Sequence, residues 1–116
     1  MKLSEIIVRD AILPDLGQMN RDEAITRLVD SLVAAGVISK RSAKDVAAAV
    51  IERENQATTG LGKGVALPHA KVGTIKRVVG AIGRSSTGIE FKALDSRPVH
   101  IVILLLSNPD RPDEHL

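Results

Sequence analysis

Histidine is the residue type in this chain best suited to covalent chemistry at neutral pH, and it occurs three times. His69 lies in the segment GKGVALPHAK, where the preceding Pro68 restricts the backbone and can hold the ring in one place. A neutral imidazole offers one nitrogen lone pair, and since the ordinary pKa of imidazole is about 6.5, this form predominates at neutral pH. His69 is therefore a candidate nucleophile, although a structural histidine at a strand end is an equal alternative from these residues alone.

The other two histidines carry weaker signals. His100 stands between Val99 and Ile101 in an apolar run and reads as an ordinary strand residue, while His115 is followed only by Leu116. No histidine pair has helical spacing, the pattern HExxH is missing and the chain has no cysteine, so we expect no metal site. The segment GLGKG lacks the spacing of a nucleotide-binding loop, and we expect no cofactor.

A stretch before His69 carries groups that suit a phosphoryl group. Phosphoryl transfer spreads negative charge over the phosphoryl oxygens, which require hydrogen-bond donors and positive charge. Arg53 can supply charge, Thr58 and Thr59 can supply hydroxyls, and Gly60 and Gly62 can supply backbone N–H groups. The simpler interpretation is a solvated arginine at a helix end followed by a tight glycine turn.

Two helices precede this stretch in the predicted structure. Asn20 followed by Glu23 is an N-cap with a capping-box partner, and Gly36 suits the helix end. Between them, one buried stripe has helical spacing and comprises Ala24, Ile25, Leu28, Val29, Leu32 and Val33. Ser39 or Ser42 can cap a second helix that runs into Arg53 and Glu54.

The remaining elements are predicted strands and loops. Residues 3–16 contain an edge strand or a loop at Pro14, and residues 57–64 are too rich in glycine for a helix. Strands are expected over 65–69, 77–83, around Phe91 and over 98–106, with a turn at Asp95 and Ser96, and the last strand is apolar enough to be central. The fold class is therefore α/β, with a mixed β-sheet flanked by helices, and the tail 109–116 resembles the opening of a further helix.

Composition excludes several functional classes. The 116 residues fit one domain, 1–116, with an aliphatic core, because Phe91 is the only aromatic residue. The formal charge of +2 is distributed without a basic patch or stacking aromatics, so nucleic-acid binding is not expected. The longest apolar run, residues 101–106, is too short to cross a membrane, and the N-terminus lacks the pattern of a signal peptide, which favours a cytoplasmic protein.

A block of these residues resembles a known family. It reads Arg53-Glu54, then Thr58-Thr59-Gly60-Leu61-Gly62, then Gly64-Val65-Ala66-Leu67-Pro68-His69-Ala70-Lys71. This is similar to the mannitol/fructose and nitrogen-regulatory type of IIA domain in the bacterial phosphotransferase system. Gly88-Ile89-Glu90-Phe91, Asp95 and Pro98-Val99 also fall where that family has an extended segment, a turn and a central strand. The resemblance covers roughly residues 3–116.

The resemblance implies a site and partners. His69 corresponds to the phosphorylated residue, Arg53 to an arginine beside it, and His115 to a second histidine facing the same pocket. The phosphoryl donor is then HPr or its nitrogen-branch relative, and the acceptor is a IIB domain, or the protein acts on regulatory targets by contact. The absence of fused IIB, IIC or HPr-like segments favours the separate regulatory form.

Two departures limit what the family resemblance implies, and the second of them, the missing C-terminal helices, favours an alternative function. Ala57 and Ala70 stand where glycine is common, which leaves the loop backbone less free to approach a phosphate. The family domain normally continues past the position of His115 into two further helices, so the implied mannitol-type fold lacks them here, as a natural short form or a truncated one. The alternative function is a non-catalytic IIA-like binding module, whereas the retained Arg53 and His69 favour the carrier.

Overall fold

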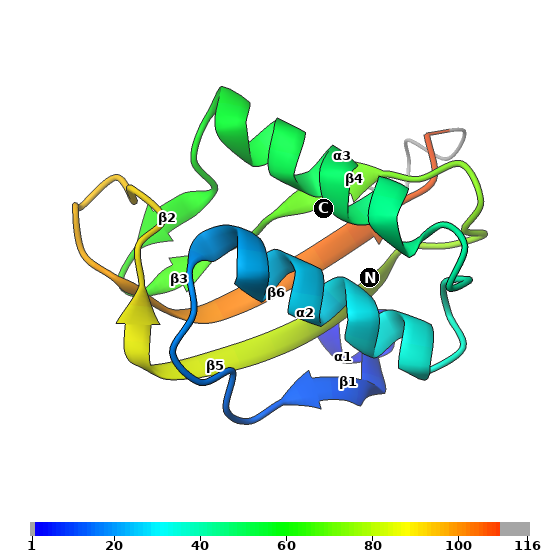
Figure 1. The fold of residues 1–116 in the computed structure, drawn as a ribbon, viewed down its shortest axis with the longest axis horizontal. Helices are drawn as coiled ribbons and strands as arrows, with labels where there is room; N and C mark the ends of the chain where they lie inside the picture. The colour runs from blue at the N-terminus through cyan, green and yellow to red at the C-terminus, as the bar shows by residue number, and fades with distance from the viewer. Residues whose placement is uncertain (1, 110–116) are drawn as a thin grey trace.

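The computed structural model describes residues 2–109, which form one mixed sheet with helices packed against it (Figure 1). The helices are α1 Leu3–Ile6, α2 Arg21–Ala34 and α3 Ala43–Gln56. The strands are β1 Ile7–Leu13, β2 Gly60–Gly62, β3 Val65–Ala66, β4 His69–Lys71, β5 Val79–Ile89 and β6 Val99–Ser107. In Figure 1, α2 and α3 lie side by side across the same face of the sheet. The predicted fold class is confirmed.

The helix starting near Asn20 forms as its sequence predicts. The Asn20 side chain accepts a hydrogen bond from the Glu23 backbone N–H at 2.8 Å, and the Glu23 carboxylate accepts one from the Asn20 N–H at 3.0 Å. Together they complete the capping box. Gly36, with a φ of 78°, follows the C-cap residue Ala35 in the left-handed region that favours glycine. The predicted stripe packs on the sheet, with Leu28 and Leu32 fully buried.

The last predicted strand lies in the middle of the sheet. The strand order is β1-β5-β6-β3-β2, and β4 also pairs with β6, which is antiparallel to β5 and parallel to β3 and β4. Its side chains alternate, so that Val102, Leu104 and Leu106 are fully buried toward the helices while Ile103 and Leu105 are half-buried on the opposite face. The nearly continuous apolar run reflects this burial, and the expectation of a central strand is confirmed.

Two local predictions need correction. Residues 57–64 are not only a loop, because Gly60–Gly62 form β2 in a hairpin with β3. The hairpin turns through Lys63 and Gly64. Their φ values of 58° and 80° are both positive, as a two-residue type I′ turn requires. The short strand expected around Phe91 is also wrong, since β5 ends at Ile89 and Lys92 has a φ of 52°, outside the extended region.

Other sequence predictions hold or fall outside the structure. Among residues 2–109 the first strand, β1, pairs only with β5, so it is an edge strand there, and it ends just before Pro14, as the proline predicts. The expected turn at Asp95 and Ser96 is present, and Ser96 has a φ of 61°. The helix opening predicted in the tail falls on residues 110–116, which lie outside the described residues.

The Asp95 carboxylate fastens the β2–β3 hairpin to the turn before β6. It accepts hydrogen bonds from the backbone N–H of Lys63 and from that of Arg97, each at 3.0 Å. The Lys63 N–H, with the Arg97 N–H second, lowers the pKa of Asp95 from its ordinary value of 3.8. A carboxylate with a lowered pKa stabilises the folded state above its unfolded pKa, and this stabilisation disappears as the pH falls through the lowered folded value.

We therefore expect the Asp95 carboxyl carbon to titrate with a midpoint below 3.8 in an NMR titration of the folded protein. The backbone N–H signal of Lys63 should move with the same midpoint, because Asp95 is its acceptor. In Asp95→Asn this movement should vanish and the Lys63 N–H should exchange faster with solvent, since an amide has one acceptor oxygen for two donors. A midpoint at or above 3.8 would contradict the assigned contacts.

Candidate functional site

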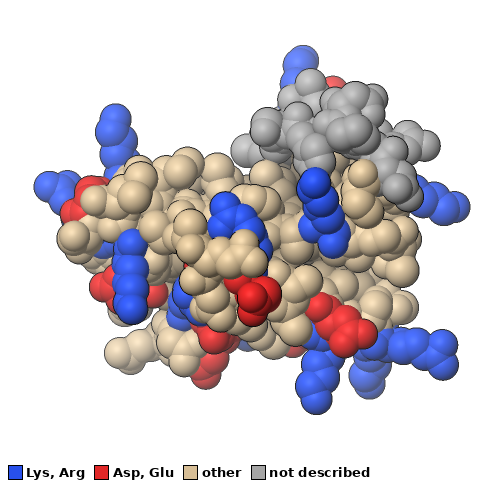
Figure 2. Space-filling model, turned by 90° about the horizontal axis from the view of Figure 1, so that it is seen from above, with Lys and Arg blue, Asp and Glu red and all other residues tan. Residues whose placement is uncertain are grey.

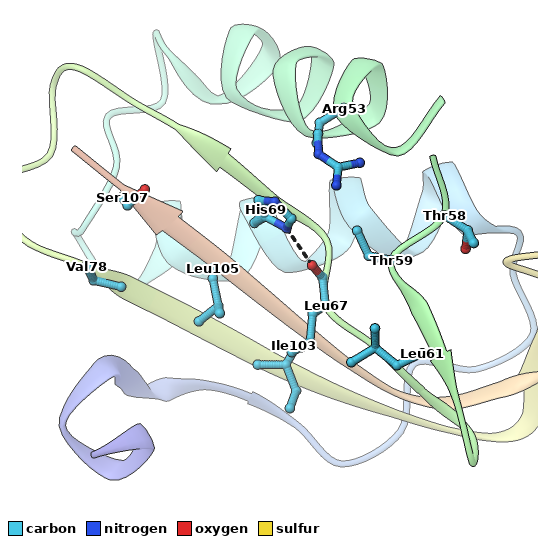
Figure 3. Close-up of a pocket in the computed structure, with 10 residues that line it drawn as sticks. All are labelled: Arg53, Thr58, Thr59, Leu61, Leu67, His69, Val78, Ile103, Leu105 and Ser107. Carbon is cyan, nitrogen blue, oxygen red and sulfur yellow. Dashed lines mark hydrogen bonds between the residues drawn. The ribbon is translucent and has the colours of Figure 1, made fainter. Parts of the chain in front are cut away.

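A pocket of about 460 Å³ lies beside β4 and the C-terminal end of α3 (Figure 3). It brings together four residues that the sequence singled out, Arg53, Thr58, Thr59 and His69. Its other walls are mostly aliphatic, and the full lining is Arg53, Thr58, Thr59, Leu61, Leu67, His69, Val78, Ile103, Leu105 and Ser107. The pocket therefore combines one imidazole and one guanidinium with a low-polarity surround.

The backbone around Pro68 places His69 at the rim of this pocket. Strands β3 and β4 both run parallel to β6, but Leu67 and Pro68 interrupt them, because proline has no N–H to donate. The Pro68 carbonyl still accepts a hydrogen bond from the Leu105 N–H at 3.0 Å, which fixes the interruption on the central strand. The chain rejoins the sheet at His69, whose side chain is exposed. The ring therefore sits on a rigid support and is open to a partner.

The His69 ring is oriented by one main-chain oxygen. Its Nδ1 lies 2.9 Å from the carbonyl oxygen of Leu67, the bond drawn in Figure 3. A carbonyl oxygen can only accept, so Nδ1 must carry the proton in this arrangement. In the neutral ring the free lone pair is then on Nε2. Nε2 is therefore the ring nitrogen whose lone pair is available to an incoming group.

Arg53 reaches the same pocket from the last turn of α3, and Figure 3 shows its guanidinium extending from the helix into the site. One terminal nitrogen, Nη1, donates to the Ala57 carbonyl at 2.9 Å, which anchors the side chain. Within residues 2–109 no carboxylate forms an ion pair with it. The remaining N–H groups of the guanidinium can therefore serve an anion, and the fork geometry matches phosphate oxygens.

The two threonine hydroxyls are already engaged inside the protein. Thr58 Oγ1 donates to the Phe91 carbonyl at 2.7 Å and accepts from the Gly60 N–H at 3.0 Å. Thr59 Oγ1 donates to the Glu54 carboxylate at 2.7 Å. Each hydroxyl has a single proton, so both protons are used in shaping the segment from 58 to 60.

The glycines allow this segment to pass close to its neighbours. A Cβ placed on Gly60 would come within 2.8 Å of the Ala93 Cβ, closer than two carbons can pack, so only glycine fits there. Gly62 has a φ of 104°, in a region that side chains disfavour. Both therefore shape the hairpin next to the pocket.

The remaining histidines do not join this group among the described residues. His100 is an exposed residue of β6 whose Nδ1 lies 2.8 Å from the Ser85 carbonyl oxygen, away from the lining of the pocket. It is an ordinary strand residue, as the sequence predicts. His115 lies outside the described residues.

One residue that supports the pocket from behind, bonded to its lining residue Thr59, was missed by reasoning from residue chemistry. Glu54 is only 3% exposed and accepts hydrogen bonds from both the backbone N–H and the hydroxyl of Thr59. Its signal was present in the sequence: an acidic residue in the last turn of a helix opposes the helix dipole and needs another reason to be there.

On the face seen in Figure 2, charges of both signs are interspersed. Figure 2 shows Lys and Arg side chains spread around the visible face with acidic side chains between them, so this face carries no single basic patch. From residue 2 to residue 109 no group of three His, Cys, Asp or Glu side chains could hold a metal ion. No helix in that part of the chain is long and apolar enough to span a bilayer.

Comparison with known proteins identifies a family that matches this chain. The model of the family described as "Phosphoenolpyruvate-dependent sugar phosphotransferase system, EIIA 2" matches residues 5–116. The chain is 36% identical over 96 residues to a fructose-specific EIIA component of Haloferax volcanii, covering 83% of this chain and 61% of that protein. It is 31% identical over 116 residues to a fructose-specific EIIABC component of Bacillus subtilis, covering all of this chain but 18% of that protein. The chain thus spans less than two thirds of both relatives.

Solved structures show the same architecture. The crystal structure of the nitrogen regulatory protein IIA-Ntr from Neisseria meningitidis superposes with a TM-score of 0.85 at 28% identity, covering 97% of this chain and 75% of that one. The IIA mannitol enzyme of Escherichia coli, solved in complex with phosphorylated IIB mannitol enzyme, superposes with a TM-score of 0.72. At 18% identity, with 89% of this chain and 72% of that one covered, this second likeness shows the fold alone.

Proposed function

The chain belongs to the EIIA 2 family of the phosphoenolpyruvate-dependent sugar phosphotransferase system, and we propose that its His69 carries a phosphoryl group between two other proteins. In this proposal residues 1–116 act as one phosphocarrier domain in the cytoplasm. The donor is HPr or a nitrogen-branch relative of HPr. The acceptor is a IIB domain, or else phosphorylation controls contact with a regulatory target.

The proposed reaction uses the lone pair on His69 Nε2. This lone pair attacks the phosphorus atom, a new N–P bond forms, and the bond from phosphorus to the donor's histidine nitrogen breaks, leaving its electron pair on the donor ring. No proton has to leave Nε2. The ring becomes cationic as its lone pair is shared, and the Leu67 carbonyl oxygen, already bonded to Nδ1–H, stabilises that charge. The reverse sequence delivers the group to the acceptor.

Arg53 stabilises the charge of the group in transit. Its unpaired N–H groups face the same pocket as His69, and a guanidinium can bind two phosphoryl oxygens at once. Since their hydroxyl protons are in use, Thr58 and Thr59 contribute by holding the segment that carries Gly60 and Gly62 against the pocket.

The rest of the proposed site excludes water. The aliphatic side chains of Leu61, Leu67, Ile103 and Leu105 line the same pocket as the imidazole and would contact an apolar patch on a docked partner. Excluding water protects the N–P bond from hydrolysis and strengthens the contact between the guanidinium and the phosphoryl oxygens. By the family resemblance His115 would add a further donor.

The observation that carries the proposal is an exposed imidazole whose Nδ1–H is tied to a carbonyl and whose pocket contains an arginine with no acidic partner among residues 2–109. Incubation with phosphoenolpyruvate, enzyme I and an HPr-type protein should add one acid-labile phosphate per chain. Nitrogen–phosphorus NMR should place it on Nε2. A protein that bound the HPr-type partner and took up no phosphate would be a binding module instead, and a phosphate on Nδ1 would refute the proposed tautomer.

A further inference from the structure

Glu54 occupies an unfavourable position for a carboxylate. It is 3% exposed, and among the buried polar side chains of residues 2–109 it alone carries a carboxyl group. It also lies in the last turn of α3, where the partial negative charge of the helix end repels an anion. A buried carboxylate in such a place is costly unless it is fully hydrogen-bonded. Its contacts therefore indicate what it does.

Both oxygens of this carboxylate bind a single residue. The Thr59 backbone N–H donates to Oε2 at 2.7 Å and the Thr59 hydroxyl donates to Oε1 at 2.7 Å. These two short bonds fix both the backbone position and the side-chain rotamer of Thr59. Thr59 is itself 4% exposed, so water does not compete for these bonds.

A continuous series of hydrogen bonds leads from Thr59 to the nucleophile. The Thr59 carbonyl accepts from the Leu67 N–H at 3.2 Å, and the Leu67 carbonyl accepts from Nδ1–H of His69 at 2.9 Å. Leu67 is therefore held on one side by Thr59 while its carbonyl holds the imidazole. Moving Thr59 would move Leu67, the residue whose carbonyl oxygen selects the tautomer of His69.

We propose that Glu54 is a positioning residue for His69, acting through Thr59 and the Leu67 carbonyl to keep the proton on Nδ1 and the lone pair on Nε2. A histidine side chain free in water favours the opposite tautomer, with the proton on Nε2, so the protein must impose the one that the structure requires. The purpose of this arrangement rests on the proposed function. The arrangement itself can be tested without any phosphoryl transfer.

The direct readout is the ring tautomer of His69. In ¹⁵N-labelled protein at about pH 8.5, two units above the ordinary pKa of imidazole, the ring nitrogen shifts report which nitrogen is protonated. We expect the wild type to show Nδ1–H. Glu54→Gln should move the population toward Nε2–H, because an amide presents one acceptor oxygen where two donors need acceptors. The matched control is Glu52→Gln on the exposed face of the same helix, which should leave the shifts unchanged.

A second variant guards against a loss of folding. Thr59→Val has almost the same shape and removes only the hydroxyl, so it should keep the fold and give a tautomer shift of the same sign but smaller size. In an assay of phosphate uptake, the rate in each variant should fall in proportion to the remaining Nδ1–H population.

The outcomes separate this inference from the proposed function. If folded Glu54→Gln and Thr59→Val retain the wild-type tautomer ratio, Glu54 is not a positioning residue, whatever happens to the transfer rate. If the ratio changes as expected while the wild type takes up no phosphate, the proposed function fails and the role of Glu54 stands. A merely structural Glu54 would lower the melting temperature without moving the ratio.

Discussion

Replacing His69 by glutamine is expected to abolish phosphate uptake, to the background of the assay, while leaving the fold unchanged. A carboxamide can occupy much of the same space, but it has no nucleophilic nitrogen lone pair. The side chain is exposed, and the hydrogen bond from its Nδ1 to Leu67 lies at the surface, so the free energy of unfolding should change by less than about 0.5 kcal/mol. Transfer of radioactive phosphate from phosphoenolpyruvate, together with chemical denaturation, measures both quantities.

His100→Gln provides the matched control for this experiment. His100 is also exposed and also bonds a carbonyl through Nδ1, but it lies outside the pocket that holds Arg53. The His100→Gln protein should take up phosphate at the wild-type rate. Uptake that survives in His69→Gln and disappears in His100→Gln would move the phosphorylated site to β6 and overturn the proposed function.

Replacing Arg53 by alanine should give the second largest effect, slowing transfer by about 100- to 1000-fold, the range seen when one donor to developing charge is removed. The cost in stability should be only about 1 kcal/mol, since one hydrogen bond to the Ala57 carbonyl is lost. The transfer rate of Arg53→Lys should fall between those of the wild type and Arg53→Ala, because an ammonium keeps the charge and loses the planar fork. Rapid-quench measurement of phosphate transfer and thermal unfolding give the two numbers to compare.

A control for net charge comes from α2. Arg27→Ala removes the same charge from an exposed position outside the pocket, so its transfer rate should stay within about twofold of the wild type at physiological ionic strength. If Arg53→Ala lost stability and rate in equal measure, the guanidinium would be a structural anchor for the helix end. The chemistry would then have to rely on backbone donors.

Sequence reasoning succeeded where the determining forces are local. The capping residues Asn20 and Glu23 act over three positions, and the apolar run of β6 reflects one buried face and one half-buried face, so both elements were readable without a structure. It failed for β2, because glycine-rich sequence gives a weak strand signal and the pairing depends on a turn at Lys63 and Gly64. Phenylalanine is common in strands, but Phe91 is buried in the core from a segment that is not a strand.

The candidate site also has a part that the sequence predicted and a part that it did not. His69 and Arg53 were identified because their side chains carry recognisable chemistry and because the surrounding block resembles a family. The link from Glu54 to the imidazole escaped because two of its steps pass through main-chain groups of Thr59 and Leu67. Main-chain groups are the same in every sequence, and only the fold decides which of them meet.

The place of β6 in the sheet also constrains how the protein is made. It is the last described strand along the chain, yet it joins β5, with its neighbour β1, to β3 and β4. Before β6 leaves the ribosome, the strand pairs of residues 2–109 that can form are the β1–β5 pair and the β2–β3 hairpin, without the strand that joins them. Assembly of the complete sheet must therefore wait until β6 has been synthesised. His69 lies about thirty residues before β6 and takes up its place beside that strand only then.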